Sequence, residues 1–327
     1  MIVLPRRALL AGAAALPASA RAATAQTLVL YTSQPDRVAA GTVAAFNRVH
    51  PGIRVQVFRS GTTSVMNRLE AEFLAGRPKP DVLLIADAMS MQALKAQGRL
   101  AAYPGADVAG LPAQAVDPQR TYFGTKLITT GFMVNKAAPL RPARWTDLLR
   151  PPAKGSIVLP SPLYSGAAMI TVGALAQNAT LGPDYLARLA ANGATAVQGN
   201  GQVLTAVAGG QDFFGIGVDF MAINAARKGS PLTFVFPADG ATAVTEPVAI
   251  LATARNPESG RAFVDFLLSP DGQALAARQG FLPARAGTAP PPGFPPPASI
   301  RLMPVDIARV LADSDALKRR FAALFGG

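Results

Sequence analysis

The chain has 327 residues, 50% of them apolar and 15% charged, a length and composition that predict a folded protein with more than one hydrophobic core. The absence of cysteine excludes thiol nucleophiles and disulfides, and the single histidine excludes histidine metal clusters. The net charge of +12 comes from scattered basic residues without a nucleic-acid-binding motif, so it predicts attraction of small anions and no nucleic-acid partner.

Residues 1–25 have the pattern of a cleaved export signal. Arg6 and Arg7 precede an apolar run at residues 8–16, and small residues spaced for signal peptidase follow, ending between residues 20 and 25. The arginine pair also loosely matches a twin-arginine signal, which leaves both Sec and Tat export open. We therefore expect a periplasmic protein.

Strand and helix patterns alternate over the next part of the chain. Residues 27–31, 53–58 and 81–86 are predicted strands, and the last is a continuous apolar run, typical of a strand buried on both faces of a parallel sheet. Pro35 followed by Asp36 marks the start of a helix between the first two strands. This alternation predicts a doubly wound α/β lobe.

The remainder of the chain continues in the same style. Strands are predicted at residues 125–135, 156–159, 213–218, 232–236 and 248–252, and helices start near Ser165, Gly182, Asn256 and Ser269. A glycine-rich turn separates the last two strands. A proline-rich linker at residues 290–297 leads to one final helix over residues 305–325.

Two stretches of small residues precede predicted helices. They are Ser60, Gly61, Thr62 and Thr63 in the first part of the chain, and Ser165, Gly166 and Ala167 in the second. A helix N-terminus presents unpaired N–H groups and a partial positive charge, and small side chains let an anion approach. A cap role would explain either stretch alone, but two of them on separate lobes predict an anion-binding cleft.

Other polar residues at the ends of predicted elements are candidate ligand contacts. Ser33 follows the first strand, and Asn200 lies in a Gly-Asn-Gly turn. Asp87 and Asp219 follow strands, whose carboxyl ends face the binding crevice of a doubly wound sheet. Either carboxylate would suit an ammonium group at the far end of a zwitterionic ligand, although a helix-capping role stays open for both.

Five phrases of the sequence together resemble a known family. They are VLYTSQPD, PDVLLIADAMSMQALKAQGRL, LPSPLYSGAA, FPADGATAVTEPVAIL and GRAFVDFLLSPDGQ, in this order. Through them nearly the whole mature chain resembles type II periplasmic solute-binding proteins of ABC importers, in the group that takes up ferric iron, 2-aminoethylphosphonate or sugar phosphates. In that family the stretch matched by Ser165, Gly166 and Ala167 binds the anion.

The resemblance implies a fold and a set of partners. It implies two doubly wound α/β lobes joined by a two-strand hinge, with a ligand cleft between them. Lobe 1 would hold residues 26–128 and 240–285, and lobe 2 residues 129–239 and 286–327. A monomer without cofactor or metal would bind a small anionic or zwitterionic ligand and deliver it to a permease in the inner membrane. Among ligands, 2-aminoethylphosphonate or a related phosphonate or phosphate ester comes first.

Three alternatives stay open. A ferric-iron receptor would need oxygen ligands, but iron-binding relatives carry adjacent tyrosines where this chain has Asp219 and Phe220. A serine hydrolase using Ser165 would lack both a G-x-S-x-G motif and a histidine base near it. A receptor that reports to a membrane sensor would have the same sequence features as a transport receptor. We expect a non-enzymatic binding protein.

Overall fold

The computed structural model describes Met1 and residues 26–326, so the predicted export signal lies outside the described residues. Ten strands form one sheet with the order β2-β1-β3-β9-β4-β7-β5-β6, and β8 and β10 pair with β4 beside this order. The strands are β1 (Gln26–Thr32), β2 (Ile53–Arg59), β3 (Val82–Leu84), β4 (Tyr122–Asn135), β5 (Ile157–Pro160), β6 (Thr195–Val197), β7 (Phe214–Val218), β8 (Leu232–Val235), β9 (Thr242–Ile250) and β10 (Leu282–Pro283).

Two long antiparallel strands, β4 and β9, connect the two halves of this sheet. Residues 122–124 of β4 pair with residues 247–249 of β9, which in turn pairs with β3. Farther along, residues 130–134 of β4 pair with β7. On either side the strands run parallel, as β2-β1-β3 and as β7-β5-β6. The predicted fold of two α/β lobes joined by a two-strand hinge is confirmed.

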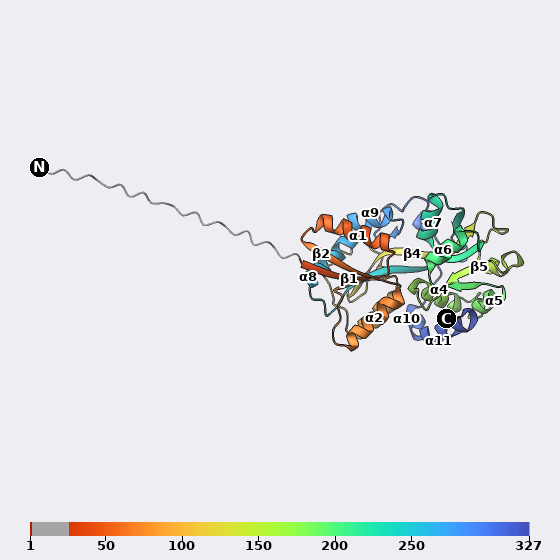
Figure 1. Ribbon diagram of the computed structural model, residues 1–327, viewed down its shortest axis with the longest axis horizontal. Coiled ribbons are helices and arrows are strands. Elements are labelled where there is room, and N and C mark those ends of the chain that lie inside the picture. Colours follow the sequence, from red (N-terminus) through yellow and green to blue (C-terminus); the bar gives the residue numbers. More distant parts are fainter. Residues whose placement is uncertain (2–25, 327) are drawn as a thin grey trace.

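The helices of the first lobe surround β2-β1-β3 (Figure 1). They are α1 (Asp36–Val49), α2 (Thr62–Leu74), α3 (Ala88–Ala96), α8 (Pro257–Leu268) and α9 (Pro270–Arg278). Their starts follow the predicted signals, because α8 and α9 both begin with proline and the Ser269 Oγ accepts a hydrogen bond from the Gly272 amide at 3.1 Å.

The second lobe carries the remaining helices on the β7-β5-β6 side. They are α4 (Gly166–Gln177), α5 (Tyr185–Ala191), α6 (Asn200–Ala208), α7 (Asp219–Arg227), α10 (Ile307–Ala312) and α11 (Ser314–Phe325). Four short 3₁₀ helices lie between these elements: η1 (Ala113–Ala115), η2 (Trp145–Leu149), η3 (Pro151–Ala153) and η4 (Pro297–Ser299). No helix among the described residues is long and apolar enough to cross a membrane.

The single final helix predicted for residues 305–325 is wrong, because the chain breaks there into α10 and α11 at Asp313. The break lets Val310 pack, fully buried, against Gly173 of α4, while Phe321 is buried separately in the second lobe. The short strand β6 and the first half of β9 were also missed, since neither has an alternating or continuous apolar pattern of sufficient length.

Each lobe has its own apolar core. In the first, the rings of Phe46 and Phe263 meet edge to face at 5.0 Å, and in the second Phe132 and Trp145 do so at 4.9 Å. A third cluster draws on both lobes and on the crossing strands, and includes Met89, Ile128, Met169, Phe220, Phe281 and Val310. The two lobes are therefore packed against each other around the region where the cavity lies.

Candidate functional site

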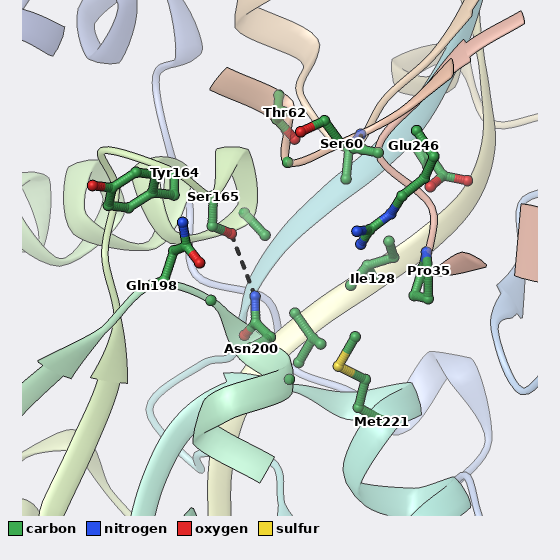
Figure 2. Close-up of a pocket in the computed structure, with 18 of the residues that line it drawn as sticks. Pro35, Ser60, Thr62, Ile128, Tyr164, Ser165, Gln198, Asn200, Met221 and Glu246 are labelled. Carbon is green, nitrogen blue, oxygen red and sulfur yellow. Dashed lines mark hydrogen bonds between the residues drawn. The ribbon is translucent and has the colours of Figure 1, made fainter. Parts of the chain in front are cut away.

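A cavity of about 400 Å³ lies between the lobes, next to the crossing strands (Figure 2). The first lobe contributes Ser33, Pro35, Arg59, Ser60, Gly61, Thr62, Ser64, Ala86 and Phe281; the second contributes Tyr164, Ser165, Ala167, the run 198–202, Val218, Phe220 and Met221; Ile128 and Glu246 come from β4 and β9. In Figure 2, Ser60 and Thr62 face Ser165 and Asn200 across this space.

Four helices begin at the wall of the cavity. The residues that precede α2, α4, α6 and α7 are Gly61, Ser165, Gly199 and Val218, and all four line it. The first turn of each helix leaves backbone N–H groups without helical partners, and the aligned peptide dipoles place positive potential there. At α7 the Phe220 amide already donates to the Asp219 carboxylate at 2.6 Å, so the convergence of α2, α4 and α6 is what makes the site suited to an anion.

Ser165 and Asn200 form the polar wall of the second lobe. The Ser165 Oγ accepts from the Ala168 amide and from the Asn200 Nδ2, both at 3.3 Å. Both hydrogen bonds leave the Ser165 hydroxyl hydrogen available to a ligand. The Asn200 Oδ1 is buried and has no hydrogen-bond partner among the described residues. Ser165 therefore caps its helix and can still contact a ligand.

Arg59 brings a cation to the first-lobe wall at the end of β2. Its Nε donates to the Gln34 carbonyl oxygen at 2.8 Å, and the exposed Asp36 carboxylate lies 3.8 Å away. The Nε contact orients the guanidinium without using its terminal nitrogens. Those remaining N–H groups can pair with an oxyanion, for which the planar guanidinium is well shaped.

Not all predicted residues meet at this cavity. Ser33, Ser60, Gly61, Thr62, Ser165, Ala167 and Asn200 line it. Thr63, Asp87 and Gly166 instead line a separate interlobe hollow, shared with α3 and α11, while Asp219 lines neither. The division has a steric cause, because the N-terminus of α4 lies directly against the loop before α3 and separates the two hollows.

The carboxylates of Asp87 and Asp219 are used within the fold. The Asp87 Oδ1 caps α3 by accepting from the Met89 amide at 2.9 Å. Asp219 accepts from the Thr129 amide and hydroxyl at 3.0 and 2.7 Å, which joins α7 to β4. Burial raises the pKa of both groups, that of Asp219 to about 7. In this arrangement neither faces the cavity, so an amine would need another partner.

Glu246 of β9 is the carboxylate that lines the cavity, and sequence reasoning missed it. It is 2% exposed, and its Oε2 accepts from the Lys126 Nζ and the Gln34 Nε2, both at 2.8 Å. No described residue donates to its Oε1. A bulge in β4 between Gly124 and Leu127 faces Glu246 and brings Lys126 beside it. A lone glutamate directly before the apolar residues 247–250 of β9 was the available signal.

Phe220 stands where iron-binding relatives are expected to carry a tyrosine. Its ring packs on Phe281 of the first lobe with centroids 4.1 Å apart, and both line the cavity. No group of three or more histidine, cysteine, aspartate or glutamate residues able to hold a metal occurs within the described part of the chain. The aromatic pair closes one wall of the cavity with apolar surface.

Comparison with known proteins agrees with this architecture. The family model described as bacterial extracellular solute-binding protein matches residues 77–309. A probable ABC transporter periplasmic-binding protein of Sinorhizobium fredii is 28% identical over 285 residues, which cover 84% of this chain and 78% of that protein.

Two solved structures have the same fold. The periplasmic binding protein AfuA of Actinobacillus pleuropneumoniae, with fructose 6-phosphate bound, superposes with a TM-score of 0.83 at 23% identity, covering 92% of this chain and 98% of that one. Iron-bound HitA of Pseudomonas aeruginosa gives a TM-score of 0.79 at 21% identity, covering 90% and 99%.

Proposed function

The chain belongs to the bacterial extracellular solute-binding proteins, the ligand-capturing components of ABC importers, and we propose that it captures a small phosphonate or phosphate ester in the periplasm for import. The proposal includes removal of residues 1–25 as an export signal and delivery of the ligand to an inner-membrane permease. We propose that the protein is a receptor, which binds and releases its ligand unchanged, and is not an enzyme.

The observation that carries this proposal is the convergence of three helix N-termini on one interlobe cavity. Gly61, Ser165 and Gly199 place α2, α4 and α6 there, and Arg59 adds a full positive charge. A tetrahedral oxyanion has several oxygens that accept hydrogen bonds from different directions, which matches donors arriving from both lobes.

The size of the expected interaction is sufficient for a transport receptor. Each hydrogen bond to a charged oxyanion contributes about 1.5–3 kcal/mol, and micromolar affinity requires about 8 kcal/mol. Four to six donors therefore suffice even after the entropic cost of association. Binding that uses donors of both lobes also favours their closed arrangement.

Among such ligands, 2-aminoethylphosphonate is our first candidate. Glu246 supplies a buried carboxylate at the cavity, with its Oε2 held by Lys126 and Gln34 and its Oε1 free of protein donors among the described residues. An ammonium or hydroxyl group of the ligand can donate to this oxygen while the phosphonate meets the helix N-termini. Glu246 thus takes the role that the sequence suggested for Asp87 or Asp219.

We also propose lobe boundaries. Residues 26–128 and 240–285 would form lobe 1, and residues 129–239 and 286–327 lobe 2. Supporting this division, the boundaries near residues 128 and 240 fall within β4 and just before β9, the two strands that cross between the halves of the sheet. The placement of α11 against α4 and α5 supports counting it with lobe 2, whereas α10 lies between α3 of lobe 1 and α4 of lobe 2.

A thermal-shift screen of the mature protein tests the proposed ligand class. The compounds are 2-aminoethylphosphonate, fructose 6-phosphate, inorganic phosphate and, as an uncharged control, fructose. A ligand at a hundred times its Kd adds about 2.7 kcal/mol to the free energy of unfolding. Stabilisation by at least one phosphonate or phosphate ester and not by fructose is expected. Stabilisation by ferric iron with a visible charge-transfer band, and by none of the anions, would overturn the proposal.

A further inference from the structure

A second polar feature lies on the first lobe, away from the ligand cavity. Two hollows of about 500 and 430 Å³ share Arg68, Lys79 and Arg255, and together they form one groove, which we call the basic groove. Its lining residues place it beside α2 and the start of α8, over the face of β1 and β2. None of its lining residues lines the ligand cavity.

The floor of the basic groove is an uncovered part of the sheet. Thr27, Val29 and Tyr31 point to it from alternate positions of β1, and Gln56 and Phe58 do so from β2. The Arg68 guanidinium lies over the Phe58 ring, 4.0 Å from its centroid. β2 is the terminal strand of the sheet in the described order, so the groove lies at an open edge.

Four cations line this groove: Arg68, Arg77, Lys79 and Arg255. Arg68 pairs with Glu72 at 3.0 Å. The side chains of the other three are exposed and make no ion pair or hydrogen bond with any described residue. Because unpaired charges of one sign lie close together, the groove carries a local positive potential.

Neither carboxylate in the groove pairs with these three cations, and four cations against two carboxylates leave the groove net positive. Glu72 accepts from the Lys79 amide at 3.0 Å and also from the Tyr31 hydroxyl. Asp81 accepts from the amides of Arg255 and Asn256 at 2.7 and 3.0 Å. Each carboxylate therefore fixes the backbone of a cation-bearing residue and leaves its charged tip free. This arrangement fixes the backbone from which Lys79 and Arg255 extend, while their charged ends stay free to meet a partner.

We infer that the basic groove docks an acidic, extended segment of a partner protein, and in an importer the partner at hand is the membrane permease. The chemistry requires several carboxylates spaced along a chain, matching three unpaired cations over two joined hollows. The groove recedes into the sheet face, which suits an inserted peptide better than a flat bilayer surface. The inference rests on the proposed function for the identity of the partner and adds the surface that contacts it. Because the groove and the ligand cavity share no residue, failure of one can be told from failure of the other.

The test measures binding of a fluorescently labelled hexaglutamate peptide by anisotropy at low salt. The variant Arg77→Gln/Lys79→Gln/Arg255→Gln removes three charges from the groove. The matched control Lys136→Gln/Lys154→Gln/Lys228→Gln removes the same formal charge from exposed positions of the second lobe. We expect the groove variant to bind the peptide at least about tenfold more weakly and the control variant to change by less than about twofold.

The remaining outcomes decide against the inference. Equal weakening in both variants would assign binding to net charge, and no binding of the peptide by the wild type would remove the site altogether. Vesicles of phosphatidylglycerol that bind through the same three residues, with no peptide binding, would identify a membrane contact instead.

Two control measurements accompany the test. Melting temperature and stabilisation by 2-aminoethylphosphonate should stay at wild-type values in both variants. If the triple variant does not fold, Lys79→Gln alone should raise the Kd of the peptide about twofold, which is one third of the tenfold effect on a logarithmic scale.

Discussion

Gly166 of the second lobe lies directly against Asp87 of the first. A Cβ atom on Gly166 would stand 2.9 Å from the Asp87 Cβ and 2.7 Å from the Ala86 carbonyl oxygen, closer than side-chain carbons approach such atoms. Nearby, a Cβ on Gly61 would stand 3.1 Å from the Tyr164 carbonyl oxygen. The starts of α2 and α4, two of the four helix starts at the ligand cavity, are thus also places where the lobes touch, so anion binding and lobe contact depend on the same two helix starts.

The first prediction follows from this contact. Gly166→Ala places a methyl group against backbone atoms of the first lobe, so the lobes can no longer meet without strain. We expect the affinity for a stabilising phosphonate or phosphate ester to fall about tenfold or more, because the donors of the two lobes no longer reach the ligand together. Calorimetry measures the affinity, and small-angle scattering should show a more open form with ligand present.

The control for this prediction is Gly52→Ala. A Cβ on Gly52 meets no atom within 4 Å, and Gly52 lies outside the cavity. This variant should bind as the wild type does. Wild-type affinity in Gly166→Ala would show that the contact at Asp87 is not part of the ligand-bound state.

The sequence predicted the fold well because its signals are local. The strand predicted at residues 81–86 and the proline starts of α8 and α9 depend on neighbouring residues. The structure has both proline starts, and the strand is present as the shorter β3 (Val82–Leu84). The family resemblance supplied the two lobes and the hinge, which no local pattern contains. The break at Asp313 was missed because it depends on where Val310 packs against α4, a contact between distant parts of the chain.

The candidate site could be predicted only in part, for a related reason. Helix starts such as Ser165 are visible in sequence, so the small residues before α2 and α4 were found. Whether a carboxylate faces a cavity or a helix end depends on tertiary packing, and Asp87 and Asp219 are used within the fold. Glu246 was missed because its position beside Lys126 depends on a bulge in a hinge strand.

The second prediction concerns Ser165. Ser165→Ala removes the hydroxyl that lines the cavity and accepts from the Ala168 amide. We expect ligand affinity to fall by about ten- to a hundredfold, the value of one charge-assisted hydrogen bond, and stability to fall by about 1 kcal/mol through loss of the cap. Titration calorimetry and chemical denaturation measure the two effects.

Ser269→Ala separates these effects. Ser269 caps α9 in the same way, with its Oγ accepting from the Gly272 amide, but it lies outside the cavity. This variant should lose a similar amount of stability and no affinity. If both serine variants keep wild-type affinity, the anion does not bind at the start of α4.

The third prediction tests Glu246 with three phosphonates that differ at one position. They are 2-aminoethylphosphonate, 2-hydroxyethylphosphonate and ethylphosphonate, which end in an ammonium, a hydroxyl and a hydrogen. The wild type should prefer the first over the last by at least about tenfold, since the free Oε1 of Glu246 accepts a ligand donor. Glu246→Gln should remove most of this difference and leave the affinity for ethylphosphonate at the wild-type value or higher, because a negative charge beside the anion site is lost.

Loss of the Glu246 charge also leaves Lys126 buried without an ion-pair partner, which costs stability. The double variant Lys126→Met/Glu246→Gln avoids that cost and should show the same loss of ammonium preference. Equal wild-type affinity for all three compounds would leave the anion site in place but remove Glu246 from ligand recognition.

The last prediction concerns the pH dependence of stability at Asp219. Burial raises its pKa from 3.8 to about 7 in the folded protein, although three hydrogen bonds from Thr129 and Phe220 partly offset this. Between these two values the folded state keeps a proton that the unfolded state has released. Asp219 therefore lowers the free energy of unfolding as pH rises through this window, by up to about 1.4 kcal/mol per pH unit, and has no further effect above it.

Asp219→Asn removes this titration. Because asparagine does not ionise, the direct effect of the new side chain on the free energy of unfolding is the same at every pH. The difference in free energy of unfolding between wild type and Asp219→Asn should therefore shift against the wild type as pH rises from about 4 to about 7, then level off. Urea denaturation at half-unit pH steps measures it. The groups with lowered pKa, such as Glu70 and Asp117, cancel in this difference because both proteins contain them. If the free energies of unfolding of the two proteins instead run parallel between about pH 4 and about pH 7, Asp219 is already ionised in the folded protein at low pH, held so by its contacts to Thr129.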